Sequence, residues 1–171
     1  MNGKLLVTYA SKYGATREIA EKIGNVLQQS GLRADVVPVK EVLGLTGYQA
    51  VILGSAVYIA KWQKEAAEFL QKNEQTLTQL PVWLFSSGPT GEGDPAELLE
   101  GWRLPVELQP IAERIQPRDI AVFGGYINPE KVNFIEKTAV KNIVKKPFGD
   151  FRDLNRIVAW ANMVAEALSA S

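Results

Sequence analysis

The chain has 171 residues, 19 Lys and Arg against 19 Asp and Glu, and neither cysteine nor histidine. Its length and its apolar fraction of 46% predict one domain, residues 1–171, with a single sizeable core. The missing residue types exclude disulfides, thiolate nucleophiles, a Ser–His triad and a structural zinc site, and we expect no metal site. The zero net charge argues against nucleic acid as a partner.

The first predicted elements are a strand at residues 4–9, a short turn and an amphipathic helix. Such a unit aims free backbone N–H groups and the positive end of the helix dipole at one point, which suits a phosphate. The turn lacks the glycine patterns of nucleoside triphosphate and dinucleotide sites, so we interpret it as a pocket for one phosphate group. The alternative is an ordinary strand–helix turn with a capping serine. The candidate ligands are Ser11, Lys12, Tyr13, Gly14, Ala15 and Thr16.

Strand and helix signals alternate along the rest of the chain, as in a parallel sheet wrapped by helices. Gly31 follows the first helix, where a C-terminal cap belongs. The remaining expected elements are strands at 34–39, 50–53, 82–85 and 120–123, helices near 66–70 and 106–115, and a last helix from about Asp153. The fold class is therefore α/β, a doubly wound sheet of five parallel strands in the order 2-1-3-4-5.

Two segments exceed this minimal fold. Residues 90–105 are rich in Gly, Pro and Glu and predict a loop, and residues 124–153 form an insertion between the fifth strand and the last helix. Within the insertion, residues 130–146 carry five Lys against two Glu and have apolar residues at helical spacing. Such a helix either rests on an anionic membrane, receives a carboxylate-bearing substrate, or is a solvated helix packed on the sheet.

Loops that leave the carboxyl ends of the strands meet at the ligand-binding edge of such a sheet. A flavin mononucleotide needs one loop for its phosphate and two loops that grip its ring system. Tyr58 and Trp62 are the candidates for ring stacking, although Trp62 also fits a helix start packed on its neighbours. Ser87 and Gly88 offer backbone groups. The candidate residues of the two ring loops are Ser55, Ala56, Val57, Tyr58 and Trp62, and Ser86, Ser87, Gly88, Pro89 and Thr90.

The first loop resembles the flavodoxin signature, with the matching residues Tyr9, Ser11, Gly14, Thr16 and Ala20. Further segments resemble the flavodoxin-domain group that includes menaquinone-dependent protoporphyrinogen oxidase, namely 54–58, 61–62, 83–89, 123–125 and 149–153. The resemblance implies a flavodoxin-like fold, non-covalent FMN and an FMN oxidoreductase that passes hydride equivalents from a porphyrinogen to FMN and then to a quinone, in heme biosynthesis.

An alternative keeps the flavin but makes the chain an electron-transfer protein between redox partners. Both functions predict a small-molecule or protein redox partner, and the oxidoreductase function also predicts a quinone at a membrane surface. A non-redox receiver module is disfavoured, because it needs acidic residues after the first strand and this chain has Tyr9-Ala10-Ser11 there. No apolar run long enough to span a bilayer and no signal peptide are evident, so the expected location is the cytoplasm, with peripheral contact to the inner face of the membrane as a variant.

Overall fold

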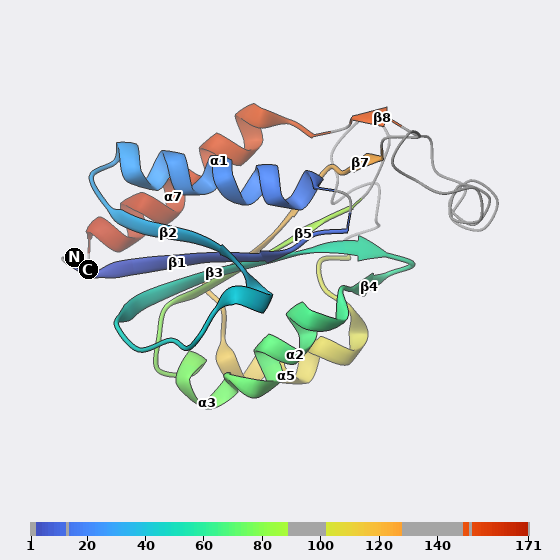
Figure 1. Ribbon diagram of the computed structural model, residues 1–171, viewed down its shortest axis with the longest axis horizontal. Helices are drawn as coiled ribbons and strands as arrows, with labels where there is room; N and C mark the ends of the chain where they lie inside the picture. The colour runs from blue at the N-terminus through green and yellow to red at the C-terminus, as the bar shows by residue number, and fades with distance from the viewer. Residues whose placement is uncertain (1–2, 13, 89–101, 128–148, 151, 171) are drawn as a thin grey trace.

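The computed structural model describes residues 3–12, 14–88, 102–127, 149–150 and 152–170 (Figure 1). The strands are β1 (Lys4–Ala10), β2 (Arg33–Pro38), β3 (Tyr48–Tyr58), β4 (Lys61–Trp62), β5 (Val82–Ser87), β6 (Asp119–Phe123), β7 (Tyr126–Ile127) and β8 (Gly149–Asp150). The α-helices are α1 (Ala15–Gln29), α2 (Lys64–Lys72), α3 (Glu74–Leu77), α5 (Gln109–Ile115) and α7 (Leu154–Ser169), and the 3-10 helices are η1 (Val39–Glu41) and η2 (Val106–Leu108).

Five parallel strands form the main sheet in the order β2-β1-β3-β5-β6. This confirms the predicted order, since β5 and β6 are the fourth and fifth strands of the prediction. The short strand β4 pairs antiparallel with the end of β3, and β7 pairs with β8 in a separate two-stranded sheet. The connections from β1 and β3 run in opposite directions across the sheet, which creates the switch point where ligands bind in doubly wound folds.

The sheet lies between two layers of helices (Figure 1): α1 and α7 cover one face, and α2, α3 and α5 cover the other. Alternate residues of each strand therefore enter two different cores. Along β1, Leu5 and Val7 belong to the core under α1 and α7, whereas Leu6 belongs to the core under α2 and α5. Both cores are apolar, and this burial supplies most of the favourable free energy of folding.

Strand β3 continues beyond its predicted end at Leu53 and reaches Tyr58. Gly54 and Ser55, expected to follow the strand, lie inside it and pair with Phe85 and Ser86 of β5. A Cβ atom at Gly54 would lie 2.0 Å from the Phe85 ring, so the glycine leaves room for that ring. The prediction was wrong at this point because a glycine in a strand can also mark a close approach of a neighbouring group.

The β3–β4 hairpin was absent from the prediction. Its two loop residues, Ile59 and Ala60, have φ values of +50° and +59°. Two-residue hairpins need positive φ at both loop positions, which usually selects Asn-Gly. The pair Ile-Ala carries no such signal, so the sequence pattern did not indicate a turn here.

Both helix boundaries that the sequence indicated are confirmed. Gly31 has a φ of +88° immediately after the C-terminal cap of α1. The Asp153 carboxylate accepts hydrogen bonds from the N–H groups of Asn155 and Arg156, at 3.0 and 3.3 Å, and so caps α7. The predicted helix within 130–146 and most of the predicted loop at 90–105 lie outside the described residues.

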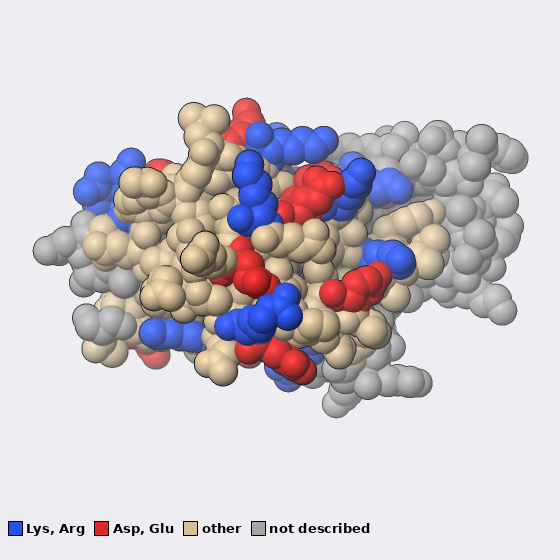
Figure 2. Space-filling view, turned by 90° about the horizontal axis from the view of Figure 1, so that it is seen from below, with Lys and Arg blue, Asp and Glu red and all other residues tan. Residues whose placement is uncertain are grey.

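Figure 2 shows the face of the molecule that carries α2, α3 and α5. Lys and Arg side chains alternate there with Asp and Glu, and the described residues form no patch of one sign in this view. Ion pairs such as Arg114–Glu74, at 2.6 Å, join neighbouring elements on it. This face therefore offers no field of one sign that would attract a charged partner.

Candidate functional site

The loop between β1 and α1 has the geometry of an anion-binding turn. Gly14 is the N-cap of α1 with a φ of +94°, a left-handed conformation that favours glycine. The Gly14 N–H donates to Ser11 Oγ at 2.9 Å, and the Gly14 carbonyl accepts from the Glu18 N–H at 3.2 Å. Because Ser11 Oγ acts as an acceptor in this bond, its own proton remains available to a ligand.

The first turn of α1 has backbone N–H groups without a partner inside the helix. No side chain caps the helix, and the first N–H groups of any helix lack partners within it. Thr16 lies in this turn with 1% of its surface exposed, and its hydroxyl has no hydrogen-bond partner among the described residues. A Cβ atom at Gly14 would meet nothing within 4 Å, so the space beside the turn is open. The residues present therefore fit a phosphate group.

Charged side chains surround this turn. Lys12 Nζ lies 4.0 Å from the centroid of the Tyr58 ring, which connects the first loop to the end of β3. Arg152, just before the last helix, contacts the Glu18 carboxylate in the first turn of α1. Sequence reasoning did not find this second contact, because its partners are 134 positions apart in the chain.

The hairpin after β3 brings the second predicted loop to the same edge of the sheet. Tyr58, the last residue of β3, is half-buried and faces the Lys12 ammonium. Ser55 is fully buried; its hydroxyl donates to the Ala56 carbonyl and accepts from the Gln63 N–H, both at 2.9 Å. This hydroxyl therefore fastens the base of the hairpin.

Trp62 and Ser86 are both buried, and for Trp62 this matches the alternative in which it packs on its neighbours. Trp62 lies in β4 with only 6% of its surface exposed, within the core under α2 and α5. Its indole N–H donates to Ser86 Oγ at 2.9 Å, and that hydroxyl donates to the Arg103 carbonyl at 2.9 Å. The Trp62 ring faces core side chains and the Ser86 hydroxyl is occupied, so the more accessible aromatic residue of the hairpin is the half-buried Tyr58.

The third predicted loop begins where three strand ends lie close together. The Gly88 N–H donates to the Phe123 carbonyl at 3.2 Å. A Cβ atom at Gly125 would lie 3.0 Å from Gly88 Cα, and one at Gly88 would lie 2.9 Å from Val57 Cβ. Glycines thus allow the ends of β3, β5 and β6 to approach each other. Ser87 is buried at the end of β5. The candidates Tyr13, Pro89 and Thr90 lie outside the described residues.

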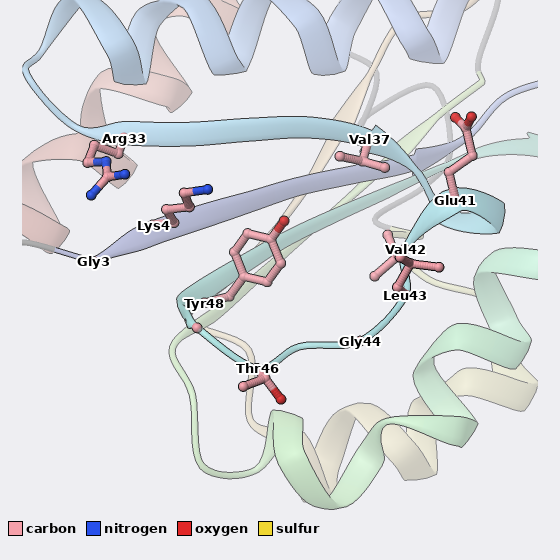
Figure 3. A pocket seen from close by; sticks show the side chains of 11 residues that line it. Gly3, Lys4, Arg33, Val37, Glu41, Val42, Leu43, Gly44, Thr46 and Tyr48 are labelled. Atoms are coloured by element: carbon pink, nitrogen blue, oxygen red, sulfur yellow. The ribbon is translucent and has the colours of Figure 1, made fainter.

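A hollow of about 730 Å³ lies away from these loops, along β1, β2 and the segment 42–48 (Figure 3). Two of its lining side chains contact Asp35 of β2: the Tyr48 hydroxyl donates to Asp35 Oδ2 at 2.9 Å, and Lys4 Nζ lies 3.7 Å from the same atom. Burial and this hydrogen bond raise the pKa of Tyr48 above its ordinary value. None of the residues that line the hollow belongs to the turn before α1.

Comparison with known proteins agrees with this fold. The family model described as "Flavodoxin domain" matches residues 6–153, so the chain belongs to this family. Protoporphyrinogen IX dehydrogenase (quinone) of Escherichia coli strain K12 is 27% identical over 85 residues, which cover 48% of this chain and 47% of that protein. The matching part thus spans about half the length of this curated relative.

Two solved structures share the fold. A flavodoxin from the domain Archaea has a TM-score of 0.65 at 15% identity, over 97% of this chain and 99% of that one. Rubredoxin oxygen:oxidoreductase from Desulfovibrio gigas has a TM-score of 0.64 at 15% identity, over 98% of this chain and 36% of that one.

Two kinds of feature are absent from the described part of the chain. None of its helices combines the length and the apolar character needed to cross a membrane. The same residues contain no group of three or more Asp, Glu, His or Cys side chains arranged to hold a metal ion.

Proposed function

We propose that the chain binds FMN non-covalently at the carboxyl edge of its sheet and works as a flavin-dependent oxidoreductase. The observation that carries this proposal is the turn before α1, where Gly14 is left-handed and gives the helix start no side-chain cap, and where Thr16 is buried in the first turn. The chain has no Cys or His to form the usual covalent bond to a flavin.

The described residues divide into two groups in this proposal. The N–H groups at the start of α1 and the hydroxyls of Ser11 and Thr16 would hold the phosphate, with Lys12 adding a positive charge. Tyr58 would stack on the flavin ring, with backbone groups of Ala56 to Val57 and Ser87 to Gly88 at its edge. Trp62 and Ser86 are left out of direct contact because both are buried and hydrogen-bonded to each other.

For the reaction, we propose a porphyrinogen as the hydride donor and a quinone as the acceptor. Bound FMN would supply the two-electron chemistry, and the protein would supply binding and orientation. Support comes from the partial similarity to protoporphyrinogen IX dehydrogenase (quinone), which covers only half of each chain. A membrane-surface encounter with the quinone belongs to this proposal, as does a cytoplasmic location.

The second candidate is an electron-transfer protein that exchanges electrons with other redox proteins. The observation that favours it is the fold match to an archaeal flavodoxin along nearly the whole length of both chains. The two candidates share the cofactor and differ only in whether a small-molecule substrate is oxidised.

Two experiments test these proposals in sequence. Titration of the purified protein with FMN should quench flavin fluorescence and give a bound visible spectrum, and riboflavin, which lacks the phosphate, should bind much more weakly. Equal affinities for FMN and riboflavin would contradict the phosphate site.

In the second experiment, the reconstituted protein is mixed anaerobically with a porphyrinogen, and a quinone is then added. Bleaching by the porphyrinogen and recovery with the quinone supports the enzyme; no bleaching, combined with rapid exchange with a redox protein, supports the carrier.

A further inference from the structure

Two consecutive hydrogen bonds connect the β3–β4 hairpin to Ser86 of the neighbouring strand and then to Arg103. The Trp62 indole N–H donates to Ser86 Oγ, and the Ser86 hydroxyl donates to the Arg103 carbonyl, each at 2.9 Å. Ser86 has no exposed surface and Trp62 has 6%. Ser86 thus uses its hydroxyl both as acceptor and as donor, and its bond to the Trp62 indole is buried.

The hairpin has few backbone pairs of its own, and its other attachments are the buried Trp62 ring and the exposed Lys61–Glu107 ion pair at 3.2 Å. Strand β4 is two residues long and pairs with β3 only at Val57 and Tyr58. Its loop places Ile59 and Ala60 in a left-handed conformation, which disfavours the turn. A short two-stranded hairpin is marginally stable by itself. Its position therefore depends on the side chains that connect it to the sheet.

Those connections come from two serines that lie side by side. Ser55 and Ser86 are in register on β3 and β5. Ser55 Oγ accepts from the Gln63 N–H, and Ser86 Oγ accepts from the Trp62 indole, so consecutive residues of the hairpin's return strand are bonded to adjacent strands. Tyr58 lies at the other side of the same loop, paired with Lys61.

We propose that Trp62 and Ser86 are positioning residues, whose hydrogen bond holds the hairpin and thereby sets the place of Tyr58 beside Lys12. The consequence for flavin binding rests on the proposed function. Neither residue contacts the ligand in this proposal. Both residues act through the hairpin backbone, and neither of them lines the candidate site.

The chain offers a matched control for this proposal. Trp160 is 7% exposed, and its indole N–H donates to Asp119 Oδ2 at 2.8 Å. Asp119 is the first residue of β6, at the end of the sheet opposite the hairpin. Trp62→Phe and Trp160→Phe thus remove the same atoms from equally buried sites, and only the first removes a bond to the hairpin.

The first measurement is amide hydrogen exchange of the flavin-free protein. In Trp62→Phe and in Ser86→Ala, amides of residues 57–63 should exchange about tenfold faster or more, relative to those of β1, because local opening costs less. Trp160→Phe should leave the hairpin amides unchanged relative to β1. The double variant Trp62→Phe/Ser86→Ala should equal the more affected single variant, because both substitutions remove the same hydrogen bond.

The second measurement is the affinity and visible spectrum of bound FMN. Trp62→Phe and Ser86→Ala should raise the FMN dissociation constant roughly three- to tenfold and shift the flavin spectrum, as expected for the loss of one buried hydrogen bond. Trp160→Phe should leave the FMN dissociation constant and the flavin spectrum unchanged. Unchanged hairpin exchange, or faster exchange with flavin affinity and spectrum equal to those of Trp160→Phe, would overturn the proposal. If the unmodified protein takes up no flavin, the proposed function fails, and the exchange comparison still decides whether this bond holds the hairpin.

Discussion

The ammonium group of Lys12 lies 4.0 Å from the centre of the Tyr58 ring, which joins the phosphate turn to the end of β3. A cation over the face of an aromatic ring is attracted by the ring's quadrupole. Lys12 can therefore act in two ways at a flavin site: its charge favours a phosphate, and its contact orients the ring that we expect to stack. The two roles can be separated by comparing the binding of FMN with that of riboflavin, which lacks the phosphate.

Lys12→Met should weaken FMN binding several-fold and leave riboflavin binding unchanged, because only FMN carries the phosphate that the charge favours. Fluorescence titration at low and high salt measures both affinities, and the difference should shrink as salt screens the charge. Lys40→Met, at an exposed position in η1, is the control. An equal loss for FMN and riboflavin would show instead that Lys12 acts through Tyr58.

Thr16→Val should weaken FMN binding by roughly 1.5–3 kcal/mol, the contribution of a hydrogen bond to a charged group. The substitution preserves the shape of the side chain, and no described residue bonds the Thr16 hydroxyl, so the fold should be kept. Fluorescence titration gives the affinity and thermal unfolding checks the fold. An unchanged affinity would mean that Thr16 only begins the helix.

Thr8→Val is the matched control for that variant and a prediction in its own right. Thr8 is fully buried in β1, and its Oγ1 atom has no hydrogen-bond partner among the described residues. Removing a buried hydroxyl without a partner should raise the free energy of unfolding by about 1 kcal/mol, with no change in flavin affinity. Denaturant unfolding measures the first quantity. A clear loss of stability would show that this hydroxyl has a partner.

Gly54→Ala should lower the free energy of unfolding by roughly 1–3 kcal/mol or more, because the new methyl group would lie 2.0 Å from the Phe85 ring in a close-packed core. Gly44→Ala is the control: its Cβ would meet nothing within 4 Å, and the expected change is within about 0.5 kcal/mol or slightly stabilising. Equal unfolding curves for the two variants would contradict a role for Gly54 in accommodating the ring.

The hairpin loop should become more stable when its residues suit its backbone. Ile59 and Ala60 both have positive φ, so the double variant Ile59→Asn/Ala60→Gly should raise the free energy of unfolding by about 1 kcal/mol. Chemical denaturation measures this change. The double variant Ile59→Gly/Ala60→Val should raise the free energy of unfolding by less, because it has a β-branched side chain at positive φ. A lower stability for the Asn-Gly variant would contradict this account of the turn.

The sequence by itself determined those features that depend on residues close together along the chain. Alternating strand and helix signals indicated a parallel α/β sheet, and the resemblance of the first loop to the flavodoxin signature implied its strand order. The start of the last helix was also predictable from nearby residues, because Asp153 accepts hydrogen bonds from N–H groups only two and three residues away. The turn before α1 was also local, with the Gly14 N–H bonded to Ser11 Oγ.

Only the tertiary structure decided what each residue of the other two loops contacts. Trp62 and Ser86 are 24 positions apart, and nothing in either segment indicates that the indole and the hydroxyl meet in the core. Gly54 looks like the end of a strand until the Phe85 ring of the next strand lies against it. The contacts of Lys12 with Tyr58 and of Arg152 with Glu18 likewise join separate segments. Periodicity reports which face of an element is buried, whereas the partner on that face depends on how the strands are ordered and in register.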